Sequence, residues 1–89
     1  MDINYPQARE RIRRRLRRIE GQVRGIERMI DEGRDCREVA QQLAAVRAAV
    51  QQAALDVLRT YADQCLSDPT GEVSREELLD YLVDTLGRA

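Results

Sequence analysis

Two long stretches of this chain carry apolar residues at alternating spacings of four and three over 19 residues each. In an α-helix these spacings gather the apolar side chains into one stripe, whereas a strand would need them at every second position. A sustained heptad pattern is typical of helices that pack lengthwise against other helices. It predicts an all-α protein with two long helices. The stripe residues are Ile12, Leu16, Ile19, Val23, Ile26 and Ile30, then Val39, Leu43, Val46, Val50, Ala53 and Val57.

Local signals predict where the two long helices begin and end. Pro6 fits the first turn of a helix, because its missing N–H would have no partner there. Glycine commonly ends helices, and Gly33 therefore predicts a first helix from about Pro6 to about Glu32. Asp35 is predicted to cap the second helix, and Glu38 three residues later completes a capping box.

The second helix meets no Gly or Pro for more than 30 residues and is predicted to reach Cys65 or Leu66. Residues 67–73 contain Pro and Gly and are predicted to form a loop. Ser74, with Glu three residues later, opens a second capping box and a short third helix. Gly87 is predicted to close that helix.

The apolar stripes are too extensive for one chain of this length to bury. Its 89 residues are enough for a single domain, residues 1–89, and so small a domain buries comparatively little surface. Two helices packed together leave part of each stripe in water, whereas two such hairpins form an antiparallel four-helix bundle. The sequence therefore predicts a homodimer built from two hairpins.

Charge is segregated along the chain. Residues 7–28 hold nine arginines against three acidic residues, a net charge of +6, and residues 63–84 hold seven acidic residues against one arginine, a net charge of −6. The basic segment favours nucleic acid as a partner, and a solvated helix face is the alternative. Only three tyrosines are present as aromatics, which favours double-stranded DNA over single strands. The arginines predicted to contact phosphates along one flank are Arg11, Arg14, Arg15 and Arg18.

Two cysteines are the candidate reactive groups, since the chain has no histidine. Cys36 is predicted as the first residue of the second helix, where the positive helix N-terminus favours a thiolate. Cys65 lies 29 residues further on, about 43 Å away in a continuous helix, and a disulfide needs Cα atoms within about 7 Å. In an antiparallel dimer, Cys36 of one subunit would face Cys65 of the other. The alternative is that each is a small buried apolar residue.

One sequence block is distinctive. Residues 18–30 read R-x-E-G-Q-V-x-G-I-x-R-M-I and are followed by Cys36. This block resembles the copper-sensitive operon repressor (CsoR) family, and the resemblance extends from about Ile12 to Leu82. It implies an all-α DNA-binding repressor without a helix-turn-helix, a dimer of hairpins that associates into a tetramer, and inducer sites between subunits. It also implies DNA contacts by Arg15, Arg18 and, less directly, Arg47.

The chain departs from the copper-sensing pattern of that family. Copper sensors bind Cu(I) with a Cys at the start of the second helix and a His-x-x-x-Cys near its end, and the matching positions here are Cys36, Tyr61 and Cys65. A phenol is a poor ligand for a soft ion, and Asp35 stands where copper sensors tend to have Tyr. Nickel and cobalt sensors use several histidines, and formaldehyde sensors usually lack the second Cys. The branch that senses persulfides keeps both cysteines without the histidine, as here.

These observations predict a cytoplasmic repressor, not an enzyme, without a resident cofactor or a membrane-spanning segment. Operator DNA would bind the arginine-rich first helix, and a persulfide or polysulfide reacting at Cys36 and Cys65 would release it. The alternatives are a Cu(I) sensor that uses the same two thiols, a formaldehyde-type sensor, and a helical-bundle interaction protein. A thiol enzyme would need a general base near its cysteine, and the absence of histidine argues against one.

Overall fold

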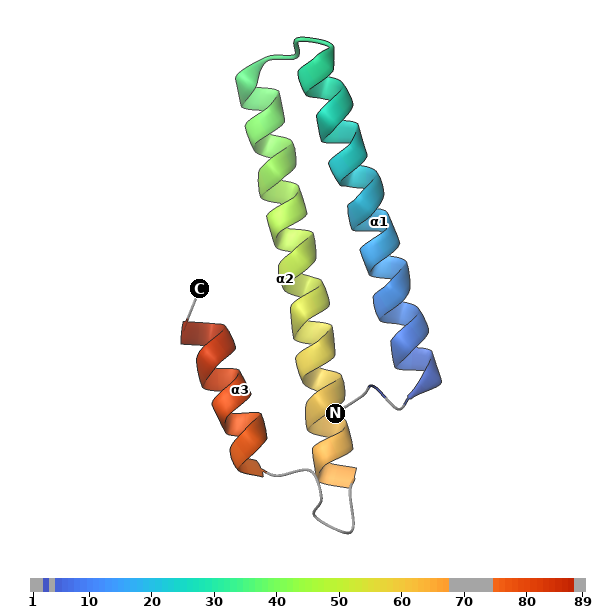
Figure 1. The fold of residues 1–89 in the computed structure, drawn as a ribbon, viewed down its shortest axis with the longest axis vertical. Helices are drawn as coiled ribbons and strands as arrows, with labels where there is room; N and C mark the ends of the chain where they lie inside the picture. Colours follow the sequence, from blue (N-terminus) through green and yellow to red (C-terminus); the bar gives the residue numbers. More distant parts are fainter. Residues whose placement is uncertain (1–2, 4, 68–74, 88–89) are drawn as a thin grey trace.

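The computed structural model describes residues 3, 5–67 and 75–87, and these form three helices that lie side by side (Figure 1). They are α1 (Pro6–Asp31), α2 (Cys36–Ser67) and α3 (Arg75–Gly87). α1 and α2 run antiparallel along each other, and α3 returns along the half of α2 that is farther from the α1–α2 turn. The described residues contain no strand, so the predicted all-α class is confirmed.

The predicted start and stop of the first helix are confirmed to within one residue. Pro6 occupies the first turn of α1, and the helix ends at Asp31. Gly33 follows with a φ of +72°, a conformation that glycine adopts without the steric cost that a Cβ would bring. The N–H groups of Gly33 and Arg34 bond to the carbonyls of Ile30 and Met29 at 3.1 and 2.9 Å. These bonds reverse the chain within a few residues.

The start of α2 differs in one detail from the predicted capping box. The Asp35 side chain accepts a hydrogen bond from the N–H of Arg37 at 3.2 Å, which confirms it as the cap. Glu38 does not complete the box as predicted. Its carboxylate instead accepts a hydrogen bond from Nε of Arg34 at 2.8 Å, because the guanidinium lies one turn away and carries a full charge.

α2 is continuous and ends at Ser67, one residue beyond the predicted limit. The rest of the predicted loop and the predicted cap Ser74 lie outside the described residues. α3 ends at Gly87, as predicted. Over the described residues, none of the helices is both long enough and apolar enough to cross a membrane.

The hairpin core uses every second member of the predicted α1 stripe. Ile12, Ile19 and Ile26, seven residues apart, are buried between α1 and α2, and Ala53 of α2 is buried with them. The other members of the α1 stripe, Leu16, Val23 and Ile30, form a second row seven residues apart and are exposed. α2 also contacts α3, and Leu58 and Cys65 of α2 are buried.

The three helices form a single layer. The molecule measures 56 × 28 × 13 Å, and its shortest dimension is close to the diameter of one helix with its side chains, about 10–12 Å. A single layer buries only the side chains between neighbouring helices. Both broad faces of the layer are therefore accessible to partners.

Candidate functional site

Arg11 and Arg15 of α1 meet the carboxylate of Asp56 on α2. Arg11 donates two hydrogen bonds, from Nε to Oδ2 at 2.8 Å and from Nη2 to Oδ1 at 2.7 Å. Nε of Arg15 lies 3.3 Å from Oδ2 of the same carboxylate. These three side chains, here called the clamp, tie the N-terminal half of α1 to a residue 45 positions further along the chain.

The clamp carboxylate is buried while its arginines face solvent. The side chain of Asp56 is 8% exposed, whereas those of Arg11 and Arg15 are 47% and 46% exposed. Hydrogen bonds from Arg11 lower the pKa of Asp56 against the opposing effect of burial, and the charges of Arg15 and Arg59 add to the decrease. The same hydrogen bonds raise the pKa of Arg11. Asp56 and Arg11 are therefore both charged at neutral pH.

A polar hollow of about 430 Å³ surrounds the clamp. Three arginines and two acidic residues line it, so the hollow carries a net positive charge. Its lining residues are Arg11, Arg15, Gln52, Leu55, Asp56, Arg59 and Asp63. Asp56 and Arg59 were not predicted as site residues, although Asp56 is the only acidic residue between Glu38 and Asp63.

The other predicted DNA contacts differ in their surroundings. Arg14 and Arg18 are exposed on α1, and neither belongs to an ion pair within the described part of the chain. Arg47 precedes Asp56 by nine residues, about two and a half turns of α2, so these two side chains point in opposite directions. The four arginines of α1 that were predicted to contact DNA thus share one helix with five other arginines, and Arg47 lies on α2 and points away from Asp56.

The two cysteines mark the two ends of α2. Cys36 is its first residue and is exposed, whereas Cys65 is buried near the C-terminal end. The 29 residues between them correspond to about eight full turns and about 43 Å, so both thiols lie on the same side of the helix but far apart. Within one chain they do not meet.

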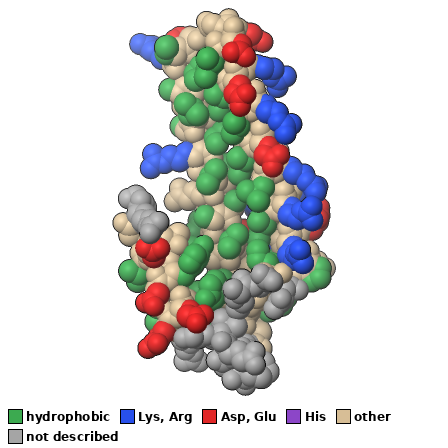
Figure 2. All heavy atoms as spheres, viewed as in Figure 1, with side chains coloured by type: hydrophobic (Ala, Val, Ile, Leu, Met, Phe, Trp, Pro, Cys, Tyr) green, Lys and Arg blue, Asp and Glu red, His purple; other side chains and the backbone are tan. Residues whose placement is uncertain are grey.

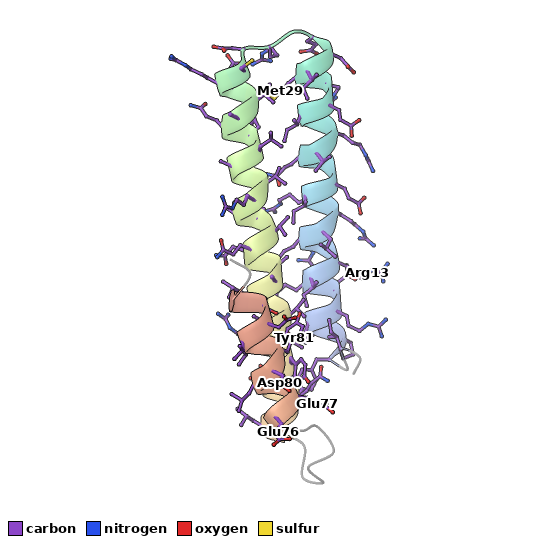
Figure 3. All side chains as sticks on the ribbon, turned by 60° about the vertical axis from the view of Figure 1, so that its left-hand side comes forward. Arg13, Met29, Glu76, Glu77, Asp80 and Tyr81 are labelled. Atoms are coloured by element: carbon purple, nitrogen blue, oxygen red, sulfur yellow. The ribbon has the colours of Figure 1, made fainter. Side chains whose placement is uncertain are left out.

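Tyr61, at the position of the expected copper-binding imidazole, packs against α3. Its ring centroid is 5.8 Å from that of Tyr81, with 30° between the ring planes. Figure 3 shows Tyr81 on α3 with the acidic residues Glu76, Glu77 and Asp80. Burial, followed by the charge of Glu77, raises the pKa of Tyr61 above its ordinary value of 10.0. Its side chain is therefore a neutral phenol at neutral pH.

The described residues fit a metal ion only in part. They contain no group of three or more His, Cys, Asp or Glu side chains that could hold a metal. Two thiols from different subunits could hold a soft ion such as Cu(I) in two-coordinate geometry, and the neutral phenol of Tyr61 adds no strong third donor. The donor set thus fits a soft ion weakly and a harder ion such as Ni²⁺ poorly.

One face of the α1–α2 hairpin is apolar. Figure 2 shows hydrophobic side chains in a continuous band along the boundary of α1 and α2. The exposed apolar residues from the predicted stripes, here called the apolar face, repeat at intervals of seven within each helix. They are Leu16, Val23, Ile30, Leu43 and Val50.

Comparison with known proteins identifies the family. The family model "Metal-sensitive transcriptional repressor" matches residues 8–88. The chain belongs to this family of repressors. The copper-sensing transcriptional repressor CsoR of Bacillus subtilis (strain 168) is 40% identical over 84 residues, which cover 88% of this chain and 83% of that protein. The resemblance to the CsoR family is confirmed.

Solved structures of family members share the fold. The copper-sensing repressor CsoR with Cu(I) from Geobacillus thermodenitrificans NG80-2 superposes with a TM-score of 0.78 at 32% identity, over 97% of this chain and 94% of that one. The nickel-responsive transcriptional regulator InrS gives a TM-score of 0.71 at 34% identity, over 99% and 96%.

Copper- and nickel-responsive members both appear among these relatives. Membership therefore establishes a metal-sensitive type of repressor without selecting its inducer. The relatives are repressors and regulators, which agrees with the expectation of a non-enzyme. The copper-sensing relatives are compatible with the Cu(I) alternative and do not support the expectation of no metal.

Proposed function

We propose that this repressor holds operator DNA through the arginines of α1 and releases it when Cys36 of one subunit and Cys65 of its neighbour react with a persulfide or polysulfide. The observation that carries the proposal is the state of Tyr61. Its phenol is neutral and packed against Tyr81, so Cys65, one turn further along α2, is the soft donor beside it.

The proposal requires a dimer, for which the apolar face supplies the surface. Leu43 and Val50 of α2 are about half exposed in one chain, and Leu16, Val23 and Ile30 of α1 are 41–60% exposed. Figure 2 shows hydrophobic side chains along the boundary of these two helices. Two hairpins packed antiparallel through this face would form a four-helix bundle and bring each Cys36 toward the partner's Cys65. Association of two such dimers into a tetramer is part of the proposal.

The two thiols suit consecutive roles. Exposed Cys36 attacks the outer sulfur of a persulfide R–S–SH, which gives Cys36–S–SH and the thiol R–SH. The Cys65 thiolate then attacks the inner sulfur of that group, which forms a disulfide between subunits and expels hydrogen sulfide. Two thiols are oxidised and the sulfane sulfur is reduced. The bridge holds the two α2 helices in one arrangement and favours a state in which the arginines no longer match DNA.

DNA binding is tested by removing Arg14 and Arg18, the two predicted contacts on α1 that have no ion pair among the described residues. Arg14→Ala with Arg18→Ala should weaken binding to a duplex selected by the wild-type protein from a random library. It should also reduce the slope of log K against log salt by about 0.9 per lost phosphate contact. Arg34→Ala with Arg37→Ala, at the opposite end of the hairpin, removes the same charge and serves as control. Equal effects of both pairs would mean that the basic helix is only a solvated face.

The inducer is tested by treating the protein–DNA complex with polysulfide, Cu(I) and formaldehyde in parallel. Polysulfide should release DNA and produce a covalent dimer in non-reducing mass spectrometry, with Cys36 of one chain joined to Cys65 of the other. Cys36→Ala should abolish the response, whereas Cys65→Ala should accept a persulfide at Cys36 without forming the bridge. Release by Cu(I) from an unmodified protein, with no effect of polysulfide, would overturn the sulfur proposal.

Cu(I) sensing is the second candidate, favoured by the identity to copper-sensing relatives. Two thiolates can bind Cu(I), and Tyr61→His would add the soft nitrogen donor that the chain lacks. In competition with a chelator such as bicinchoninate, this variant should bind Cu(I) more tightly than the wild type. An unchanged Cu(I) affinity would show that position 61 does not face the thiol pair.

A further inference from the structure

We propose that Asp56 is a positioning residue for DNA recognition, which orients the guanidinium groups of Arg11 and Arg15 so that their other N–H donors face the duplex. The inference rests on the proposed function, since it concerns how the arginines of α1 bind DNA. It assigns a role to Asp56, which among the described residues is the carboxylate that joins α1 to α2.

The clamp leaves each arginine with donors to spare. A guanidinium carries five N–H donors in a fixed plane. Arg11 uses two of these on Asp56, and Arg15 uses at most one. About half of each side chain is exposed, so the unused donors are accessible to a phosphate or to the edge of a base. The carboxylate fixes the plane of each guanidinium group and therefore the direction in which the unused donors point.

Fixed arginines contribute to binding differently from free ones. A long side chain loses rotamer freedom when it binds a partner, and an arginine already held by a carboxylate loses less. Phosphate contacts that are held in place set the register of a protein on the duplex. We therefore assign register to Arg11 and Arg15, and sequence-independent attraction to Arg14 and Arg18, which have no ion pair among the described residues.

A phosphate should not displace Asp56 from the clamp. The Asp56 side chain is 8% exposed, and removing its arginines would leave a buried charge without compensation. The clamp also points away from the apolar face. Asp56 follows Leu43 by 13 residues, which turns its side chain about 140° around α2. A second copy can thus cover the apolar face while the clamp faces DNA.

The test compares Asp56→Asn with Asp63→Asn. Both changes remove one negative charge from the lining of the same hollow, but Asp63 is exposed and makes no hydrogen bond to the arginines of the clamp. Affinities are measured for the duplex selected by the wild-type protein and for a scrambled duplex of the same composition. Asp56→Asn should lower the ratio of the two affinities at least tenfold, without weakening binding to the scrambled duplex. Asp63→Asn should leave the ratio unchanged.

If both variants change the two affinities alike, Asp56 only stabilises the hairpin and the proposal is wrong. If the wild-type protein itself binds no duplex with a steep salt dependence, the proposed DNA-binding function is wrong, independently of the role of Asp56. Helicity measured by circular dichroism at the assay temperature shows whether each variant is folded.

A measurement on the wild-type protein covers the case in which Asp56→Asn does not fold. In nitrogen-15 NMR spectra, Nε–H of Arg11 should be protected from exchange in the free protein and stay protected when the selected duplex is bound. Loss of this protection on DNA binding would mean that Nε–H of Arg11 leaves Asp56 when the duplex binds. Asp56 would then be a competitor for the arginines, which contradicts a positioning role.

Discussion

Leu43 offers a direct test of the apolar face, because truncating it should weaken the dimer without weakening the helix. Leu43→Ala removes most of an exposed apolar side chain two turns into α2, and alanine is the strongest helix former. Any loss of association can then be attributed to the surface between subunits.

The size of the effect follows from the exposure of Leu43. Complete burial of a leucine side chain is worth about 1.5–3 kcal/mol. Leu43 is 53% exposed in the single chain, so about half of that value is gained only on association. A symmetric dimer contains two copies, and alanine keeps part of the contact. We expect Leu43→Ala to weaken the free energy of dimerisation by about 2 kcal/mol per dimer. This corresponds to about a thirtyfold increase in the dimer dissociation constant.

Sedimentation equilibrium over a range of protein concentrations measures this constant. The control is Leu55→Ala, which removes the same side chain at 40% exposure from a different side of α2, twelve residues beyond Leu43. It should leave dimerisation nearly unchanged. If Leu55→Ala weakens the dimer as much as Leu43→Ala, or if neither variant has an effect, the apolar face is not the contact between subunits.

Three further predictions concern stability and titration. The pKa of Asp56 is lowered from its ordinary value of 3.8. The stabilising contribution of its carboxylate should therefore be complete above pH 3.8 and be lost as pH falls through the lower folded-state pKa. The difference in melting temperature between wild type and Asp56→Asn should disappear over that range. Tyr61 has a raised pKa, so it should ionise above pH 10.0 in ultraviolet titration of the folded protein. The free energy of unfolding should fall as pH rises through that folded-state pKa. Tyr61→Phe should remove this titration step. Asp35→Ala should lower the free energy of unfolding by about 1 kcal/mol through loss of the cap on α2, as measured in urea, whereas an unchanged stability would show that the exposed bond to Arg37 contributes nothing.

Much of the local structure was determined by the sequence itself. Apolar spacing and the residues at the ends predicted α1 and α2 to within one residue, because helix boundaries depend on neighbours a few positions away. The distance between Cys36 and Cys65 followed as soon as α2 was continuous. The family was also recognisable from one short block, residues 18–30.

Only the tertiary structure decided how each stripe is divided. Ile19 and Val23 belong to the same heptad pattern, yet the first is buried and the second is 41% exposed. Local sequence treats the two rows alike, because both repeat every seven residues. The direction from which α2 packs against α1 selects the row that becomes hairpin core and leaves the other as the apolar face.

The clamp was also decided by tertiary structure. The six arginines from Arg11 to Arg18 look equivalent along one helix. A charge pattern does not reveal which of them meets a carboxylate 45 residues away. The contact of Tyr61 with Tyr81 likewise needs α3 to return along α2. Both depend on how helices distant in sequence pack together, because long-range contacts form only when the whole chain has closed its loops.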